Sequence, residues 1–196
     1  TNTNTYTHVD ADNVARDQRG GRWKKVSPTM QQFMTHLTPK ARILDLGCGP
    51  GQDTEMFNQH GFYAIGADLS WGMLMQARQW VIGEFIQADM RFLPLPNRHF
   101  DAVWLSASLL HLPRTEAPRA LQEVNRVLRR NGLLNLTVKM GQGEKMQTNL
   151  GERYFTLYSI EEMTALLDNS GFEVQQHQIN ENGRFDPWLN LIAVKR

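Results

Sequence analysis

The chain has 196 residues, of which 41% are hydrophobic and 21% are charged, and its formal net charge at pH 7 is +1. This composition is typical of one domain with its own core, and a charge so near zero disfavours a wide nucleic-acid or anionic membrane surface. The single cysteine, Cys48, excludes an intrachain disulfide and a multi-cysteine metal site and favours a cytoplasmic protein, and no apolar run approaches the roughly 20 residues of a membrane helix.

The first part of the chain is polar. Residues 1–27 contain a Gly-Gly pair and no sustained apolar pattern, so we expect an N-terminal arm or lid rather than a separate domain. Pro28 begins a helix that the Thr38-Pro39 pair ends. We expect residues 28–196 to form a single domain.

Strand and helix patterns alternate from Arg42 onward. The predicted strands span residues 42–47, 63–69, 84–89, 101–108 and 133–140, and the predicted helices span about 53–61, 71–80, 116–130 and 160–171. Such alternation is typical of a parallel sheet with helices on both faces.

The last two apolar runs break this rhythm. Residues 172–179 and 188–194 are separated only by "NENGRFDP", which is too short for a parallel crossover of a dozen or more residues. We therefore expect these two strands to form an antiparallel hairpin.

Three glycines follow the first predicted strand, in "RILDLGCGPGQD". Gly47, Gly49 and Gly51 lie at the carboxyl end of a strand, where ligands bind in open α/β sheets, and glycine lets a ligand approach the main chain. Asp68 ends the next strand about 20 residues downstream, a position that suits ribose hydroxyls. With Asp45 and Asp89, it predicts three carboxylates around one ligand, a charge that repels phosphate and favours a cation.

The segments "LDLGCGPG", "GADLS", "ADMRFLPLPNRHFDAVWLSASLLHLP" and "EVNRVLRRNGLL" occur in this order and resemble the signature of class I S-adenosylmethionine-dependent methyltransferases of the small-molecule branch. The resemblance runs from about Arg42 to the end. It implies a Rossmann-like, doubly wound α/β fold with a seven-stranded sheet, parallel except for its last strand. It also implies S-adenosylmethionine as cofactor, S-adenosylhomocysteine as product, and methyl transfer to O, N or S of a small-molecule acceptor.

The resemblance also implies roles for single residues. Gly47, Cys48 and Gly49 would pack against the methionine part of the cofactor. Asp68 would bind the ribose hydroxyls, Asp89 and Met90 would border the adenine, and Asp45 would order the loop and meet the amino group. The full predicted cofactor set is Asp45, Gly47, Cys48, Gly49, Asp68, Leu69, Met73, Asp89, Met90 and Ser106.

Other interpretations of the glycine loop stay open. A glycine-rich loop by itself can be a simple turn. A nicotinamide-dependent dehydrogenase also has such a loop with a downstream acid, but this loop lacks the third glycine of G-x-G-x-x-G, and the C-terminal hairpin fits that fold poorly. A P-loop is excluded because no G-K-S/T follows.

Methyl transfer from a sulfonium needs alignment first and a general base only for some acceptors. His111, just beyond the fourth strand, is the candidate base because an imidazole titrates near neutrality. The alternative is that His111 caps the following turn or packs against Leu112. The histidines do not have the spacing of a metal site such as H-E-x-x-H, so we expect no metal.

The long connection 141–158 predicts a lid inserted over the acceptor. Candidate acceptor-binding residues are Tyr154 and Tyr158, with Phe155, Trp104 and Trp188 as further aromatics, and Tyr6 and Trp23 of the arm. The alternative is that each aromatic fills the seam between lid and sheet. Two other functions stay open: an RNA methyltransferase acting on tRNA, which the near-neutral charge disfavours, and a cofactor-binding partner subunit without turnover.

Overall fold

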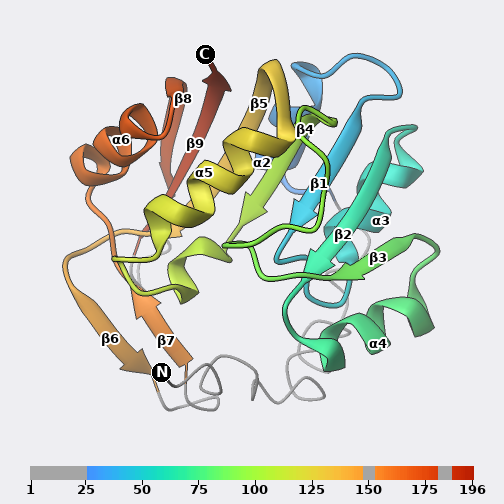
Figure 1. Ribbon diagram of the computed structural model, residues 1–196, viewed down its shortest axis with the longest axis horizontal. Coiled ribbons are helices and arrows are strands. Elements are labelled where there is room, and N and C mark those ends of the chain that lie inside the picture. Colours follow the sequence, from blue (N-terminus) through green and yellow to red (C-terminus); the bar gives the residue numbers. More distant parts are fainter. Residues whose placement is uncertain (1–25, 148–152, 181–186) are drawn as a thin grey trace.

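The computed structural model describes residues 26–147, 153–180 and 187–196. A seven-stranded sheet forms its centre, in the order β3-β2-β1-β4-β5-β9-β8 (Figure 1). Its strands are β1 (Arg42–Leu46), β2 (Tyr63–Asp68), β3 (Glu84–Gln87), β4 (Phe100–Ser106), β5 (Leu128–Lys139), β8 (Phe172–Asn180) and β9 (Trp188–Lys195).

The pairing of the strands confirms the predicted fold class. Strands β1 to β5 pair in parallel, whereas β9 pairs antiparallel with both β5 and β8. The strand order reverses between β1 and β4, and the crevice at such a switch point is where open α/β sheets bind ligands.

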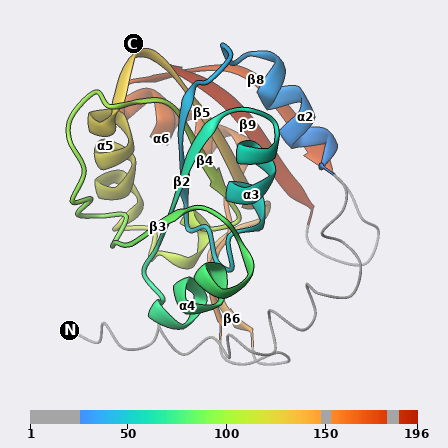
Figure 2. The same cartoon turned by 90° about the vertical axis from the view of Figure 1, so that its right-hand side faces the viewer.

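Helices cover both faces of the sheet (Figure 2). Helices α2 (Pro28–Thr35), α3 (Gln52–Gln59) and α4 (Trp71–Trp80) lie on one side, and α5 (Ala117–Val127) and α6 (Ile160–Asn169) on the other. The alternation of β1 separates the two cores, since Ile43 packs with Phe33 and Phe57, whereas Leu44 packs with the cluster that contains α5 and α6.

The predicted helix 116–130 is wrong at its C-terminal end. Helix α5 ends at Val127, and Leu128 is already extended and pairs with Phe100 of β4. The ammonium group of Lys195 donates hydrogen bonds to the carbonyl oxygens of Asn125 and Leu128. A lysine from the last strand therefore satisfies carbonyl groups at the helix end, and β5 begins there.

The connection 141–158 contains a second, two-stranded sheet. Strand β6 (Glu144–Gln147) pairs antiparallel with β7 (Arg153–Thr156), and we call these two strands the hairpin. In Figure 1 the arrowheads of β1, β2 and β4 point toward the lower part of the picture, where the hairpin and α4 lie. The carboxyl ends of the central strands thus lie at the same end of the molecule as these elements. None of the helices in the described part of the chain has the length and apolar character that a membrane-crossing helix needs.

Candidate active site

The glycines between β1 and α3 have two different tasks. All three have positive φ, but a Cβ on Gly47 would lie 2.3 Å from the Cβ of Ser108, and one on Gly51 would lie 2.8 Å from the Phe85 ring. A Cβ on Gly49, at φ +53°, would meet no atom within 4 Å. Gly47 and Gly51 therefore permit close packing inside the protein, whereas Gly49 presents bare main chain to open space.

Asp68, the last residue of β2, holds the loop at this position. One of its carboxylate oxygens accepts a hydrogen bond from the Gly49 N–H and the other accepts one from the Ser70 N–H, each at 2.8 Å. Ser70 in turn caps α4, because its hydroxyl oxygen accepts from the N–H of Met73 at 3.3 Å. Asp68 therefore joins the glycine loop to the start of α4 and is held rigidly at the strand end.

Two further carboxylates lie beside this loop. Asp45 of β1 is only 3% exposed and accepts a hydrogen bond from the Thr54 hydroxyl at 2.6 Å. Asp53, in the first turn of α3, accepts a hydrogen bond from the indole N–H of Trp104 at 2.6 Å. Sequence reasoning missed both Asp53 and Thr54 as site residues, although their place in the helix that follows the glycine loop could have indicated them.

We call Asp45, Asp53 and Asp68 the acidic group. Burial raises the pKa of each, and the charges of Asp53 and Asp68 raise the pKa of Asp45 further, well above its usual range. Within the described residues, no lysine or arginine forms an ion pair with these three carboxylates. A ligand with a positive charge would relieve both effects, so the residues present fit a sulfonium cofactor that also carries an amino group.

Asp89 does not belong to the acidic group. Its carboxylate accepts several hydrogen bonds from Arg91, the shortest at 2.6 Å, and Arg91 also lies 3.5 Å from Glu116. Arg91 therefore balances the charge of Asp89, and the expectation that Asp89 lies beside the same ligand as Asp45 and Asp68 stays a prediction. A contact from the main chain of Asp89 or Met90 to an adenine stays a prediction.

The other predicted cofactor residues lie at or shortly after the carboxyl ends of β1, β2 and β4. Cys48 is buried beside Leu74 and Phe85, and burial raises the pKa of its thiol well above the usual range, which suits packing and not nucleophilic chemistry. Met73 is buried in the first turn of α4, and the Leu69 carbonyl accepts a hydrogen bond from Gln87 at 3.0 Å. Ser106 ends β4, two residues before Ser108, whose hydroxyl donates to the Leu46 carbonyl at 2.8 Å.

His111 closes the short 3-10 helix η3 (Leu109–His111) after β4. Its Nδ1 lies 2.9 Å from the carbonyl oxygen of Tyr154, which can only accept, so Nδ1 carries a proton and Nε2 of the neutral ring is left with its lone pair. Burial lowers the pKa of His111, and the charges of Arg153 and Lys139 lower it further. The imidazole is therefore neutral near pH 7, as a general base must be.

The aromatic residues predicted to bind the acceptor do not gather in one place. The Tyr154 hydroxyl hydrogen-bonds Glu144, and its main chain holds His111. Tyr158 is 1% exposed, its ring lies under Arg114, and burial raises its pKa to about 12.

Trp104 is buried against Phe33 and Phe57, so it belongs to the core and does not line an acceptor pocket. Trp188 is half-buried beside Lys139, and Tyr6 and Trp23 lie outside the described residues.

Residues 43–132 match the family model described as a methyltransferase domain. This stretch, slightly less than half of the chain, is similar to a methyltransferase domain. The fold of the chain agrees, because a SAM-dependent methyltransferase from Methanosarcina mazei superposes with a TM-score of 0.78 at 21% identity, covering 87% of this chain and 98% of that one. The fold is therefore the Rossmann-like methyltransferase fold that the sequence predicted.

Two further comparisons concern proteins with named substrates. A 1,6-didemethyltoxoflavin-N1-methyltransferase from Burkholderia thailandensis, solved with S-adenosylhomocysteine, superposes with a TM-score of 0.75 at 22% identity, covering 97% of this chain and 88% of that one. A malonyl-(acyl-carrier protein) O-methyltransferase from Enterobacter lignolyticus is 37% identical over 98 residues, or 50% of this chain and 38% of that protein. The chain spans 34% to 38% of the length of three curated relatives that it matches.

Proposed function

We propose that this chain binds S-adenosylmethionine across the carboxyl ends of β1, β2 and β4 and catalyses transfer of its methyl group to O, N or S of a small-molecule acceptor. The observation that carries the proposal is the acidic group next to the bare main chain of Gly49, with no protein cation paired to it among the described residues. The names of relatives that methylate a malonyl group or a toxoflavin precursor support a small acceptor.

The cofactor, when bound, supplies a methyl group on a sulfonium with a thioether as leaving group. The residues of the chain then have to align it, and alignment of two reactants contributes on the order of 7 to 11 kcal/mol. Asp68, whose position is fixed by Gly49 and Ser70, orients the ribose. Asp45 and Asp53 stabilise positive charge at the methionine end.

His111 lies on the acceptor side of this arrangement. Since Nδ1 donates to the Tyr154 carbonyl, Nε2 accepts the proton of an acceptor hydroxyl, amine or thiol as the methyl group arrives. The hairpin supplies the Tyr154 carbonyl, so the lid positions the base. We also propose that residues 28–196 are one domain, with 141–158 as the lid, and that the protein is cytoplasmic, which its single buried cysteine supports. The predicted arm, residues 1–27, lies almost wholly outside the described residues.

Calorimetric titration with S-adenosylhomocysteine tests the proposal. We expect binding in the micromolar range, and we expect Asp68→Ala to weaken it by about 1.5 to 3 kcal/mol, the value of hydrogen bonds to a charged group. Asp168→Ala is the matched control, because Asp168 is an exposed aspartate of α6 paired with Arg196. No binding by folded protein would contradict the proposal. Unchanged affinity of the Asp68 variant would contradict its ribose role.

Product formation separates an enzyme from a cofactor-binding partner subunit. A panel of phenols, amines, thiols and carboxylates is incubated with the cofactor, and S-adenosylhomocysteine release is measured. Turnover above the protein-free rate supports the enzyme. Retention of tRNA that weakens steeply with salt, together with no turnover of the panel, would favour the RNA methyltransferase instead.

A further inference from the structure

The side of His111 that faces the hairpin carries positive charge. Side chains alternate along a strand, so Arg153 and Phe155 share one face of β7. Phe155 is buried with its ring centroid 4.9 Å from that of His111. Arg153 therefore projects toward the same side as Phe155, and it directly precedes the Tyr154 carbonyl that holds the imidazole.

One donor of the Arg153 side chain has no partner. Its Nε atom is buried and has no hydrogen-bond acceptor among the residues that the structure describes. The carboxylate of Glu144 on the opposite strand does not serve it, because Glu144 accepts from the Arg114 N–H at 2.8 Å and hydrogen-bonds the Tyr154 hydroxyl. A buried donor without an acceptor loses its hydration and gains nothing in return, so native structures seldom contain one without a function.

A second cation lies beside the same ring. The ammonium group of Lys139, at the end of β5, lies 4.2 Å from the Phe155 ring centroid and 5.6 Å from that of Trp188. Phe155 thus lies close to both His111 and Lys139, with Arg153 on its own strand. This acceptor side is basic, whereas the acidic group lies at the loop after β1 on the cofactor side.

We propose that the methyl acceptor carries an oxyanion group, a carboxylate or a phosphate, and that Arg153 binds it next to His111. A guanidinium presents its N–H groups in a planar fork that matches the two oxygens of such a group. The inference rests on the proposed function, because it takes the His111 side of the crevice as the acceptor side. It names the substrate class of that site.

Binding of small probes to the full chain saturated with S-adenosylhomocysteine tests this inference. The probes are benzoate, phenyl phosphate and the uncharged benzamide, each titrated by calorimetry. We expect at least one anion to bind about tenfold tighter than benzamide, the preference that one hydrogen-bonded charge pair provides. The benzoate and phenyl phosphate arms distinguish a carboxylate from a phosphate.

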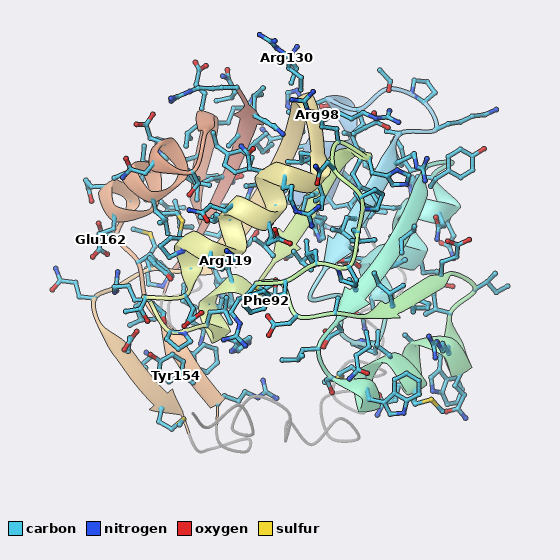
Figure 3. All side chains as sticks on the ribbon, in the orientation of Figure 1. Phe92, Arg98, Arg119, Arg130, Tyr154 and Glu162 are labelled. Atoms are coloured by element: carbon cyan, nitrogen blue, oxygen red, sulfur yellow. The ribbon has the colours of Figure 1, made fainter. Side chains whose placement is uncertain are left out.

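Variants then assign the preference to one side chain. We expect Arg153→Gln to reduce the affinity for the preferred anion about tenfold, down to that of benzamide, without changing S-adenosylhomocysteine affinity. Arg130→Gln is the matched control, because Arg130 is exposed and lies at the end of the molecule opposite Tyr154 (Figure 3). Arg153→Lys keeps the charge and loses the fork, and we expect it to retain only part of the preference.

The outcomes separate the two proposals. If S-adenosylhomocysteine fails to bind the wild type, the proposed function fails. If it binds but neither anion binds better than benzamide, or if Arg153→Gln and Arg153→Lys both keep the full preference, the inference about Arg153 is overturned and the proposed function stands. Circular dichroism confirms the fold of each variant, and Arg153→Lys decides the question if Arg153→Gln does not fold.

Discussion

The indole N–H of Trp104 donates a hydrogen bond to the carboxylate of Asp53 at 2.6 Å. Trp104 is 2% exposed and packs against Phe33 and Phe57, so this bond joins the aromatic core under α2 and α3 to the acidic group. Burial raises the pKa of Asp53, and the bond from Trp104 opposes that rise. The core thus takes part in holding a negative charge in the cofactor site.

Replacing Trp104 by phenylalanine removes the donor and leaves the Asp53 carboxylate buried with one partner fewer. We expect Trp104→Phe to lower the free energy of unfolding by about 1 to 3 kcal/mol, the cost of a buried polar group that loses its partner. Trp71→Phe is the matched control, because Trp71 is 50% exposed on α4. Urea unfolding measures both, and equal losses in the two variants would contradict the structural role of the bond.

The acidic group makes stability depend on pH in an unusual direction. The pKa of Asp45 in the folded state lies above that of an unfolded aspartate, about 3.9. The folded state therefore binds the Asp45 proton more tightly than the unfolded state does. The stability that this proton contributes is fully present below about pH 4 and is lost as the pH rises through the raised pKa. We expect the ligand-free protein to lose stability from this group as the carboxylate ionises.

Asp45→Asn removes the pH-dependent contribution of Asp45 to stability, because asparagine does not titrate. We expect the free energy of unfolding of Asp45→Asn relative to wild type to increase as the pH rises above about 4, by at most about 1.4 kcal/mol for each pH unit. Urea unfolding at a series of pH values measures this difference. A difference that is independent of pH would contradict the raised pKa.

Alanine substitutions at Gly47 and Gly49 should differ in whether stability or cofactor affinity is lost more. In Gly47→Ala the new methyl group would lie 2.3 Å from the Ser108 Cβ, so we expect a loss of stability of about 1 to 3 kcal/mol from overpacking and strain. In Gly49→Ala the methyl group meets open space, so we expect about 1 kcal/mol from positive φ alone, and a larger loss of cofactor affinity. Thermal unfolding and calorimetry measure the pair, and the reverse order would place the ligand elsewhere.

The lowered pKa of His111 predicts how the rate of methyl transfer depends on pH. Because its pKa is lowered by burial and by Arg153 and Lys139, the neutral form persists below the ordinary value near 6.5. We expect the rate of methyl transfer to rise with pH through this lowered pKa and to level off above it, and His111→Gln to be slower by about 100-fold without that pH dependence. The exposed His177→Gln is the control. An unchanged rate and profile in His111→Gln would leave alignment alone as the mechanism.

The fold, and the proximity of the glycine loop to Asp68, could be predicted from the sequence alone. The strand and helix periods are local patterns, and the eight residues between the predicted strands 172–179 and 188–194 are too few for a parallel crossover. β8 and β9 do pair antiparallel. That Gly49 and Asp68 lie close together could also be predicted, because residues at the carboxyl ends of neighbouring parallel strands must lie at one edge of the sheet.

Only the tertiary structure decided which charges are paired and what surrounds His111. Asp89 follows β3 as Asp68 ends β2, but Arg91, two residues further along, compensates it, whereas Asp53 joins the acidic group because α3 packs beside β1 and β4. Arg153 lies near enough to His111 to affect its charge because the hairpin folds back onto η3, and Lys139 acts on it from the end of β5. Apart from the Asp89–Arg91 pair, these arrangements bring together side chains from distant segments, and no local period in the sequence contains that information.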